Sequence, residues 1–256
     1  MRERVRLVNI GRHFVQLKVK KNCKLTYEYR YPLLKLIYKA LEKEDKEKAK
    51  KLHGYGYRVE NKPFKLLNPI LLFKNAVFNE NYIQLESEDI IELMLSGTEE
   101  NINLIIKNLI KTSEIELCNC KFQVVNIRQD KQIKFKRQML YKVISQVVES
   151  TYDNRVKYLS PYQPQFYAAL AQNLKRKYEL IYEEEYKDEI YFDIENVLTI
   201  KKKKIQNIKE EGYRIGYGNF NIWIEASIKM QRVAYYTGLG QANMLGAGAL
   251  IHLTSN

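Results

Sequence analysis

The sequence predicts an α+β fold of two tandem ferredoxin-like (RRM-like) domains with antiparallel sheets. The length, 256 residues, fits one or two domains. Strand and helix patterns follow the order βαββαβ along the first half of the chain, and the second half repeats that order. A polar, basic segment over Asp130–Lys136 separates the two series. We therefore expect one domain at residues 1–130 and a second at 131–256.

The first series begins with alternating segments and an amphipathic helix. Apolar and polar residues alternate over Val5–Ile10 and Phe14–Val19, as they do in strands. Leu34, Ile37 and Leu41 then repeat at helical spacing, after a proline that a first helical turn tolerates. The remaining elements expected in this half are a charged helix from Glu44 to about Leu52, strands at Phe64–Leu67, Ile70–Phe73 and Tyr82–Leu85, helices at Asp89–Met94 and Glu99–Leu109, and a strand at Ile115–Ile127.

The second series has the same order without residue-level similarity to the first. The pattern predicts a strand at Gln138–Val148 and a helix from about Gln165 to Glu184, whose apolar residues fall on one face. The remaining elements expected here are a strand at Ile190–Ile200, a basic run at Lys201–Lys204, a strand at Asn221–Lys229, a helix at Met230–Tyr236 and a last strand at Leu245–Leu253.

The charge of the chain indicates a polyanionic partner. Lys and Arg number 43 against 30 Asp and Glu, which gives a net charge of +13. The 20 tyrosines favour nucleic acid over an anionic membrane surface, because bases stack on aromatic rings. No apolar run has the length of a membrane span or of a signal peptide, so we expect a cytoplasmic protein without membrane partners.

The cysteine count and the absence of common catalytic motifs exclude several classes of protein. The odd count of three cysteines argues against a disulfide framework. Cys118 and Cys120 could form half of a metal site, but no second pair completes it, and the alternation around them favours a strand. The sequence has no Walker loop, no H-E-x-x-H and no G-x-S-x-G.

A glycine-rich segment near the C-terminus is the sharpest local signal. Gly238, Gly240, Gly246 and Gly248 lie within eleven positions of a chain that has 11 glycines in all. Glycines allow positive φ and close backbone approach, so exposed N–H groups here would form an anion-binding concavity. A tight hairpin before a final strand explains the same residues equally well.

The pattern G-[hydrophobic]-G-x5-G-x-G resembles the signature loop of the CRISPR-associated repeat-processing endoribonucleases, the Cas-six family of the RAMP superfamily. Further matches in order and spacing are Leu36–Leu41, Lys51–His53, Phe64–Leu66, Tyr158–Pro161 and Asn173–Tyr178. The likeness therefore covers most of the chain, and tandem ferredoxin-like domains are the fold of that family. Ala247 departs from the family, where an aromatic residue is common, and Gln241 replaces a residue that is often charged.

The resemblance implies a metal-independent endoribonuclease that uses no cofactor. Such an enzyme cuts CRISPR precursor RNA within its repeats by 2′-OH attack and leaves a 2′,3′-cyclic phosphate and a 5′-OH. The partner that the resemblance implies is CRISPR repeat RNA. Other CRISPR effector subunits and a second copy of the chain are further partners compatible with it. The alternatives are a non-catalytic RAMP protein that holds CRISPR RNA in an effector complex and a basic module for another RNA, such as transfer RNA.

Three residues match the catalytic positions of the family. His53 follows a basic helix, and imidazole titrates near neutral pH, so it can give or take a proton. Tyr38 and Lys65 match the family's tyrosine and lysine, as a counterpart in proton transfer and as a cation that stabilises the phosphorane. Tyr38 could instead pack on its helix, and Lys65 could be an ordinary surface lysine. His13 and His252, in or beside expected strands, fit structural roles better.

The remaining candidates are residues that would bind RNA. Lysine and arginine side chains bind RNA phosphates. A basic run such as Lys201–Lys204 could equally be a solvated loop with no ligand. The RNA-binding candidates are Gly238, Gly240, Gln241, Asn243, Gly246, Gly248, Lys201, Lys202, Lys203, Lys204, Arg128, Lys134, Lys136, Arg137, Lys175 and Arg232.

Overall fold

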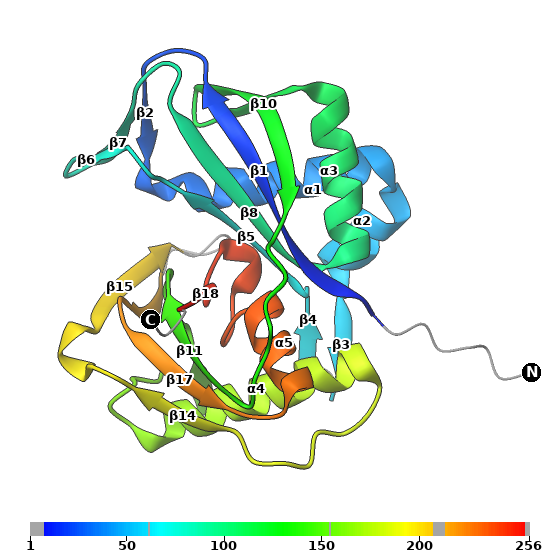
Figure 1. Cartoon of the computed structure of the whole chain (residues 1–256), viewed down its shortest axis with the longest axis vertical. Helices are drawn as coiled ribbons and strands as arrows, with labels where there is room; N and C mark the ends of the chain where they lie inside the picture. The colour runs from blue at the N-terminus through cyan, green and yellow to red at the C-terminus, as the bar shows by residue number, and fades with distance from the viewer. Residues whose placement is uncertain (1–7, 61, 154, 207–212, 254–256) are drawn as a thin grey trace, which may run out of the picture.

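A computed structural model of the chain describes residues 8–60, 62–153, 155–206 and 213–253. Two main sheets, each with its own helices, lie one above the other in Figure 1. The first sheet takes its strands from residues 10–129, and the second takes its strands from residues 138–252. Among the described residues, no helix combines the length and apolar character needed to cross a membrane.

The first main sheet has five antiparallel strands in the order β5-β8-β1-β10-β9. Val15, Leu17 and Leu93 on one face pack against apolar side chains of two helices and form the larger hydrophobic core. The strands are β1 (Ile10–Val19), β5 (Leu67–Leu72), β8 (Ile90–Thr98), β9 (Glu114–Leu117) and β10 (Cys120–Gln129), and the helices are α1 (Arg30–Glu44) and α3 (Glu99–Thr112).

Smaller elements complete the N-terminal half. Helix α2 (Lys46–Gly54) follows α1 at once, because Asp45 caps it by accepting a hydrogen bond from the Lys48 N–H over 2.9 Å. The short strands β3 (Tyr57–Val59) and β4 (Lys62–Phe64) form a hairpin after α2. A three-stranded sheet comprises β2 (Cys23–Thr26), β6 (Val77–Phe78) and β7 (Tyr82–Leu85), and the 3-10 turn η1 (Tyr27–Tyr29) follows β2.

The second main sheet has four antiparallel strands in the order β14-β17-β11-β18. Its members are β11 (Gln138–Val143), β14 (Tyr191–Ile194), β17 (Asn221–Glu225) and β18 (Leu250–His252), with helices α4 (Pro164–Tyr182) and α5 (Ile228–Thr237). Two hairpins, β12 (Ser150–Asp153) with β13 (Arg155–Tyr158) and β15 (Lys201–Gln206) with β16 (Tyr213–Gly218), and two 3-10 turns, η2 (Val197–Thr199) and η3 (Asn243–Leu245), complete this half.

Both main sheets have the strand order of a ferredoxin-like fold. Taking the four strands of each βαββαβ unit in chain order, the spatial order is second, third, first, fourth in both halves. The expectation of two tandem ferredoxin-like units with antiparallel sheets is confirmed. The boundary at residues 130/131 stays a prediction, because Ile10 and Leu66 from the first half pack in the core of the second.

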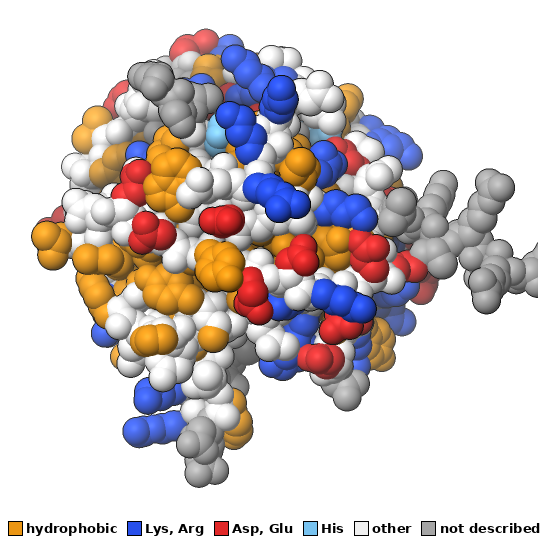
Figure 2. Space-filling view, turned by 60° about the horizontal axis from the view of Figure 1, so that its bottom comes forward, with side chains coloured by type: hydrophobic (Ala, Val, Ile, Leu, Met, Phe, Trp, Pro, Cys, Tyr) orange, Lys and Arg blue, Asp and Glu red, His pale blue; other side chains and the backbone are white. Residues whose placement is uncertain are grey.

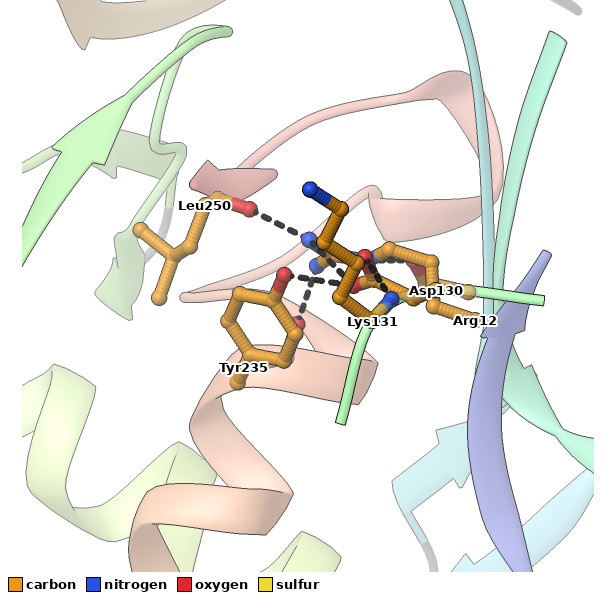
Figure 3. Close-up of polar contacts among 6 residues, drawn as sticks. Arg12, Asp130, Lys131, Tyr235 and Leu250 are labelled. Carbon is orange, nitrogen blue, oxygen red and sulfur yellow. Dashed lines mark hydrogen bonds and ion pairs between the residues drawn. The ribbon is translucent and has the colours of Figure 1, made fainter. Parts of the chain in front are cut away.

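A buried arginine joins the two halves (Figure 3). Arg12 on β1 has only 1% of its surface exposed. Its guanidinium donates to Ser96 Oγ on β8 over 2.6 Å and to the carbonyls of Tyr235 and Leu250 over 2.6 and 2.9 Å. Asp130 Oδ2 lies 3.9 Å from Arg12 Nη1 and accepts a hydrogen bond from the Tyr235 hydroxyl over 2.7 Å. One side chain thus connects the first sheet to α5 and to β18.

Several expected elements differ in the structure. The helix expected at Asp89–Met94 is wrong, since these residues begin the buried strand β8. A single strand, Ile10–Val19, replaces the two expected before residue 20, although Val5–Leu7 lie outside the described residues. Cys118 and Asn119, both with positive φ, form a turn that divides Ile115–Ile127 into β9 and β10.

In the second half, four expected strands are shorter or begin elsewhere. The strand expected at Asn221–Lys229 ends at Glu225, and Ile228 and Lys229 begin helix α5. Strand β11 ends at Val143, where a strand was expected to reach Val148, and Ile190–Ile200 contains only β14 followed by a 3-10 turn. The last strand begins at Leu250, because the glycine-rich segment folds into a 3-10 turn first. The basic run Lys201–Lys204 lies in strand β15, paired with β16.

Candidate functional site

The structure brings His53 and Tyr38 together at the end of α2. Helices α1 and α2 form a hairpin, so the last turn of α2 returns along the middle of α1. The ring centroids of Tyr38 and His53 lie 5.0 Å apart with their planes at 74°, an edge-to-face contact. Tyr38 is half-buried and packs against the first core, whereas His53 is exposed. An imidazole in this position is open to a ligand and fixed on one side by the phenol.

Lys65 joins the same cluster from the short link between β4 and β5. Its ammonium donates to the carbonyl of His53 over 2.8 Å and to the carbonyl of Leu52. The close return of the chain depends on Gly56, which has φ +61° and whose added Cβ would lie 2.3 Å from the Phe64 carbonyl oxygen. The ammonium has three N–H donors, and the two carbonyls occupy two of them. Among the described residues, no acceptor takes the third N–H, which leaves it open to an anion.

The environment changes the pKa of two members of this cluster. Burial raises the pKa of Tyr38 to about 12, so its phenol holds its proton at neutral pH. Burial, and then the positive charge of Arg58, lowers the pKa of Lys65. The cluster therefore contains a protonated phenol, an exposed imidazole and an amine with a weakened hold on its proton. These are groups suited to proton transfer and to binding an anion.

The other two histidines lie apart from this cluster. His13 lies inside β1, and its Nε2 pairs with Glu99 Oε2 on α3 over 2.9 Å. His252 lies in β18 beside the ring of Tyr141, with centroids 6.1 Å apart. Burial and the nearby charge of Lys136 lower the pKa of His252. Both histidines contact other parts of the fold, in agreement with the structural roles expected for them.

The glycine-rich loop, residues 238–248, packs into the molecule between the two halves. Its four glycines all have positive φ and all are buried. An added Cβ would lie 1.9 Å from the Leu239 carbonyl oxygen at Gly248 and 2.8 Å from the Pro69 carbonyl oxygen at Gly246. The glycines are therefore required by close packing of the loop on itself and on β5.

The backbone N–H groups of this loop do not form the anion-binding concavity that the sequence predicts. Those of Leu239 and Gln241 donate to Gly248 and Val148, and that of Gly248 donates to Gln146. The N–H groups of Gly238, Leu245, Gly246 and Ala247 also have backbone acceptors. The expectation of a series of exposed N–H groups is wrong for these residues, because their N–H groups donate to carbonyls of the loop and of the segments packed against it. Gln241, Ala242 and Asn243 remain partly exposed.

The basic candidates fall into several environments. Lys201–Lys204 are exposed on β15, and the Lys204 ammonium lies 4.2 Å from the centre of the Tyr213 ring. Arg128 pairs with buried Glu92 over 3.0 Å and covers the ring of Phe14. On the face shown in Figure 2, Lys and Arg side chains gather in the upper part, with Asp and Glu side chains between them and a further basic group below.

The remaining basic candidates lie near the connection between the halves or on helices. Lys134, Lys136 and Arg137 are exposed on the segment before β11, and Lys175 is half-buried on α4. Arg232 on α5 lies 5.6 Å from the Tyr236 ring and 5.9 Å from the Phe135 ring. Basic and aromatic side chains therefore occur together both on β15–β16 and on α5.

Sequence reasoning missed two residues that support this site. Arg58 on β3 was not singled out, although its charge acts on Lys65. Lys177 was noted only as part of a resemblance, but it lies fully buried under the glycine-rich loop. A signal for Lys177 was present, since it stands three residues after Leu174 and seven after Leu170, on the apolar face of its helix.

Comparison with known proteins agrees with this fold. Residues 127–251 match the family model described as CRISPR associated protein Cas6, C-terminal. The chain is 26% identical over 237 residues to the CRISPR-associated endoribonuclease Cas6 1 of Methanocaldococcus jannaschii, and the match covers 90% of this chain and 87% of the relative.

Two solved structures show the same fold. One is a Cas6-related protein from Pyrococcus furiosus, with a TM-score of 0.78, 19% identity and coverage of 97% of this chain and all (100%) of that one. The other is described as an RAMP protein binding different RNA substrates, with a TM-score of 0.80, 19% identity and coverage of 95% and 100%. At 19% identity, these structures share the fold of the chain. Residues 127–251 match the C-terminal part of the Cas6 family, and the chain is similar to a Cas6 endoribonuclease along most of its length.

Proposed function

We propose that this protein is an endoribonuclease that cuts CRISPR precursor RNA within its repeats. The observation that carries the proposal is the cluster of Tyr38, His53 and Lys65, three residues from separate elements that meet at one exposed point. The name of the M. jannaschii relative, an endoribonuclease, supports the same activity. The basic and aromatic residues of β15 and α5 are proposed to hold the RNA.

The proposed reaction is transesterification inside the RNA and uses no metal ion. The ribose 2′-oxygen loses its proton and bonds to the adjacent phosphorus, and the bond from phosphorus to the 5′-oxygen breaks. The departing 5′-oxygen takes up a proton, which leaves a 2′,3′-cyclic phosphate and a 5′-OH. One group must accept a proton, a second must donate one, and a cation must stabilise the phosphorane.

We assign these roles to the three clustered residues. His53 and Tyr38 carry out the two proton transfers, and their edge-to-face contact fixes the angle between them. Lys65, one of whose N–H groups meets no acceptor in the described part of the chain, binds the phosphate oxygens. The pH dependence of the cleavage rate in variants of His53 and of Tyr38 shows which residue accepts the proton and which donates it.

The deciding experiment is cleavage of a repeat RNA in EDTA. We expect cleavage of all-ribose RNA and no cleavage of the same RNA with deoxyribose at the scissile nucleotide. His53→Ala is expected to lower the single-turnover rate by about a hundredfold or more, with RNA affinity retained. His252→Gln is the matched control, since it changes a histidine outside the cluster, and it is expected to cleave at the parent rate.

The outcomes separate this proposal from the alternative. Tight binding of repeat RNA with no cleavage under any condition would favour a non-catalytic RNA-binding member of the superfamily. Cleavage that requires Mg²⁺ would refute the metal-independent reaction. Cleavage by His53→Ala at the parent rate would show that the site assignment is wrong.

A further inference from the structure

Lys177 is a buried lysine to which the proposed reaction gives no task. It lies on α4, and only 2% of its surface is exposed. Burial of an ammonium costs free energy unless hydrogen bonds and opposite charge compensate it. A methionine or leucine would fill this place in an apolar helix face without that cost, so the lysine requires a specific explanation.

The ammonium of Lys177 uses its donors on one segment. It donates to the carbonyls of Gly238 and Gly240 over 2.8 and 3.1 Å and to Asn243 Oδ1 over 2.8 Å. An ammonium has three N–H groups, and all three acceptors belong to the glycine-rich loop. Asn243 in turn links two parts of the loop, because its Nδ2 donates to the carbonyls of Leu239 and Ala247 over 3.1 and 3.0 Å.

A buried carboxyl group lies on the same side of the loop. Glu149 has 2% of its surface exposed, and its negative charge acts on Lys177. Its Oε2 accepts a hydrogen bond from Gln241 Nε2 over 3.0 Å, while Oε1 has no partner among the described residues. A Cβ on Gly240 would come within 3.3 Å of that oxygen. The loop therefore packs against two buried titratable side chains, Lys177 and Glu149.

The same loop is connected to the helix that carries Tyr38. Arg30, the first residue of α1, donates to the carbonyl of Leu245 over 3.1 Å and to Gln146 Oε1 over 2.8 Å. Asn68 on β5 donates to the Ala247 carbonyl over 2.9 Å. Three side chains from α1, β5 and α4 thus bind the carbonyls of the loop. Lys177 is the one that binds its first half, at Gly238, Gly240 and Asn243.

We propose that Lys177 is a positioning residue that holds the glycine-rich loop in the conformation that binds RNA. The inference rests on the proposed function, since it takes RNA as the ligand of the loop. Lys177 itself does not touch RNA, because it lies beneath the loop. The surface of the loop that is left for RNA is the partly exposed stretch around Ala242, since the amides of Gln241 and Asn243 are hydrogen-bonded within the protein.

Two measurements on Lys177→Met test this role. Hydrogen exchange of the peptide covering 238–249 reports the loop without RNA, and we expect exchange to become about tenfold faster or more. Affinity for a repeat RNA with deoxyribose at the scissile nucleotide reports binding without cleavage, and we expect Kd to rise about tenfold. The single-turnover cleavage rate at saturating RNA is expected to change less than about threefold.

The matched control is Lys187→Met, which makes the same change at an exposed position of the same half. We expect no change in exchange or in Kd. Should Lys177→Met fail to fold, the measurements are made on Asn243→Ala, which removes one acceptor and leaves the lysine in place. A smaller change in the same direction, about threefold, is then expected.

The results decide between the inference and the function on which it rests. Unchanged exchange in 238–249, or faster exchange with unchanged Kd, overturns the positioning role. A parent protein that binds repeat RNA and never cleaves it refutes the proposed enzyme and leaves this inference standing. A parent protein that does not bind repeat RNA refutes both the proposed function and RNA as the ligand of the loop.

Discussion

Tyr38 shows how burial of one side chain sets a chemical role. Its ring packs against the first core and contacts His53, and burial raises its pKa to about 12. A phenol with that pKa is protonated over the whole range in which RNA enzymes are assayed. In the proposed reaction, Tyr38 therefore begins as a hydroxyl group, which can donate and accept a hydrogen bond, and not as a phenolate.

Tyr38→Phe removes that hydroxyl and keeps the ring. We expect the single-turnover cleavage rate to fall on the order of a hundredfold, because one proton transfer loses its partner. The melting temperature should stay within about 2 °C, since the packing of the ring is retained. Rate profiles from pH 5 to 9, with parent protein as reference, provide the measurement. A parent-like rate across that range would remove Tyr38 from the reaction.

Glu149 makes the folded protein less stable as the pH rises toward 7. Burial raises its pKa to about 7, and the nearest compensating influences are Lys177, Gln241, the Ser150 N–H and Lys62. In the unfolded chain the carboxyl group titrates near its ordinary, lower pKa. The folded state thus binds the proton more tightly, so its stabilisation is complete at low pH and is lost as pH rises toward 7.

Glu149→Gln removes this titration and nearly preserves the shape. The free energy of unfolding of the parent, measured relative to that of the variant, should fall by about 2 kcal/mol from pH 5 to pH 7. Burial lowers the pKa of Lys177 to about 7, so below that pH the lysine is charged in both the folded and the unfolded chain. It therefore adds little to the pH dependence of the free energy of unfolding. Urea titrations at the two pH values measure the difference. Parallel pH dependence of parent and variant would contradict the prediction.

At the scale of elements, the turn after α2 sets the position of Lys65. Gly56 follows α2 with φ +61°, and its Cα lies close to the Phe64 carbonyl and to the Lys65 side chain. The β3–β4 hairpin can return under the end of the helix only because no Cβ is present there. The position of Lys65 therefore depends on the positive φ of Gly56, which lies before strands β3 and β4 in the chain.

Gly56→Ala should displace that hairpin. We expect a loss of stability of about 1–3 kcal/mol from the strained φ and the clash, and a cleavage rate reduced about tenfold or more. The matched control is Gly54→Ala, at a position where an added Cβ meets nothing within 4 Å. That change should leave cleavage intact and stability equal or slightly higher. Equal effects of the two substitutions would disprove the role of Gly56.

The elements also show where sequence patterns succeed and fail. The helices α1, α3 and α4 were predictable, because one face of each packs on a sheet and the other meets solvent. The pattern predicts a helix in part of β8, because Ile91, Leu93 and Met94 are all buried. Helices α1 and α3 cover one face of the strand, and the C-terminal half covers the other. A strand buried on both faces has no alternation to detect.

The site was predictable to a different degree. The resemblance pointed to Tyr38, His53 and Lys65, and the structure brings them together, although their catalytic roles stay a prediction. The shape of the glycine-rich loop could not be derived from the sequence. Whether its N–H groups face a ligand or close internal turns depends on Val148 and Gln146, which are about ninety residues away.

At the scale of the whole molecule, Arg12 makes the two halves depend on each other. Its guanidinium binds acceptors from β8, α5 and β18 in a buried place and stacks 3.7 Å from the centre of the Tyr235 ring (Figure 3). Charged hydrogen bonds in a buried place are costly to break singly, because the remaining groups stay unsolvated. We therefore expect the two halves to unfold in one transition.

Arg12→Met tests that expectation. The free energy of unfolding should fall by about 3–5 kcal/mol, the range typical for the loss of one partner of a buried ion pair. The control is Arg155→Met, an exposed arginine on β13, which should change stability by less than about 0.5 kcal/mol. Urea unfolding followed by circular dichroism gives both values. An Arg12→Met protein as stable as the control would show that this contact does not hold the halves together.

The position of the glycine-rich loop has a consequence for self-association. Strand β5 is an outer strand of the first sheet, and an open outer strand can pair with a strand of another molecule. Pro69 within β5 lacks an N–H donor, and Gly246 lies against the carbonyl of that same proline. The loop thus shields a sheet edge from intermolecular pairing, so a variant whose loop opens is expected to aggregate at high concentration.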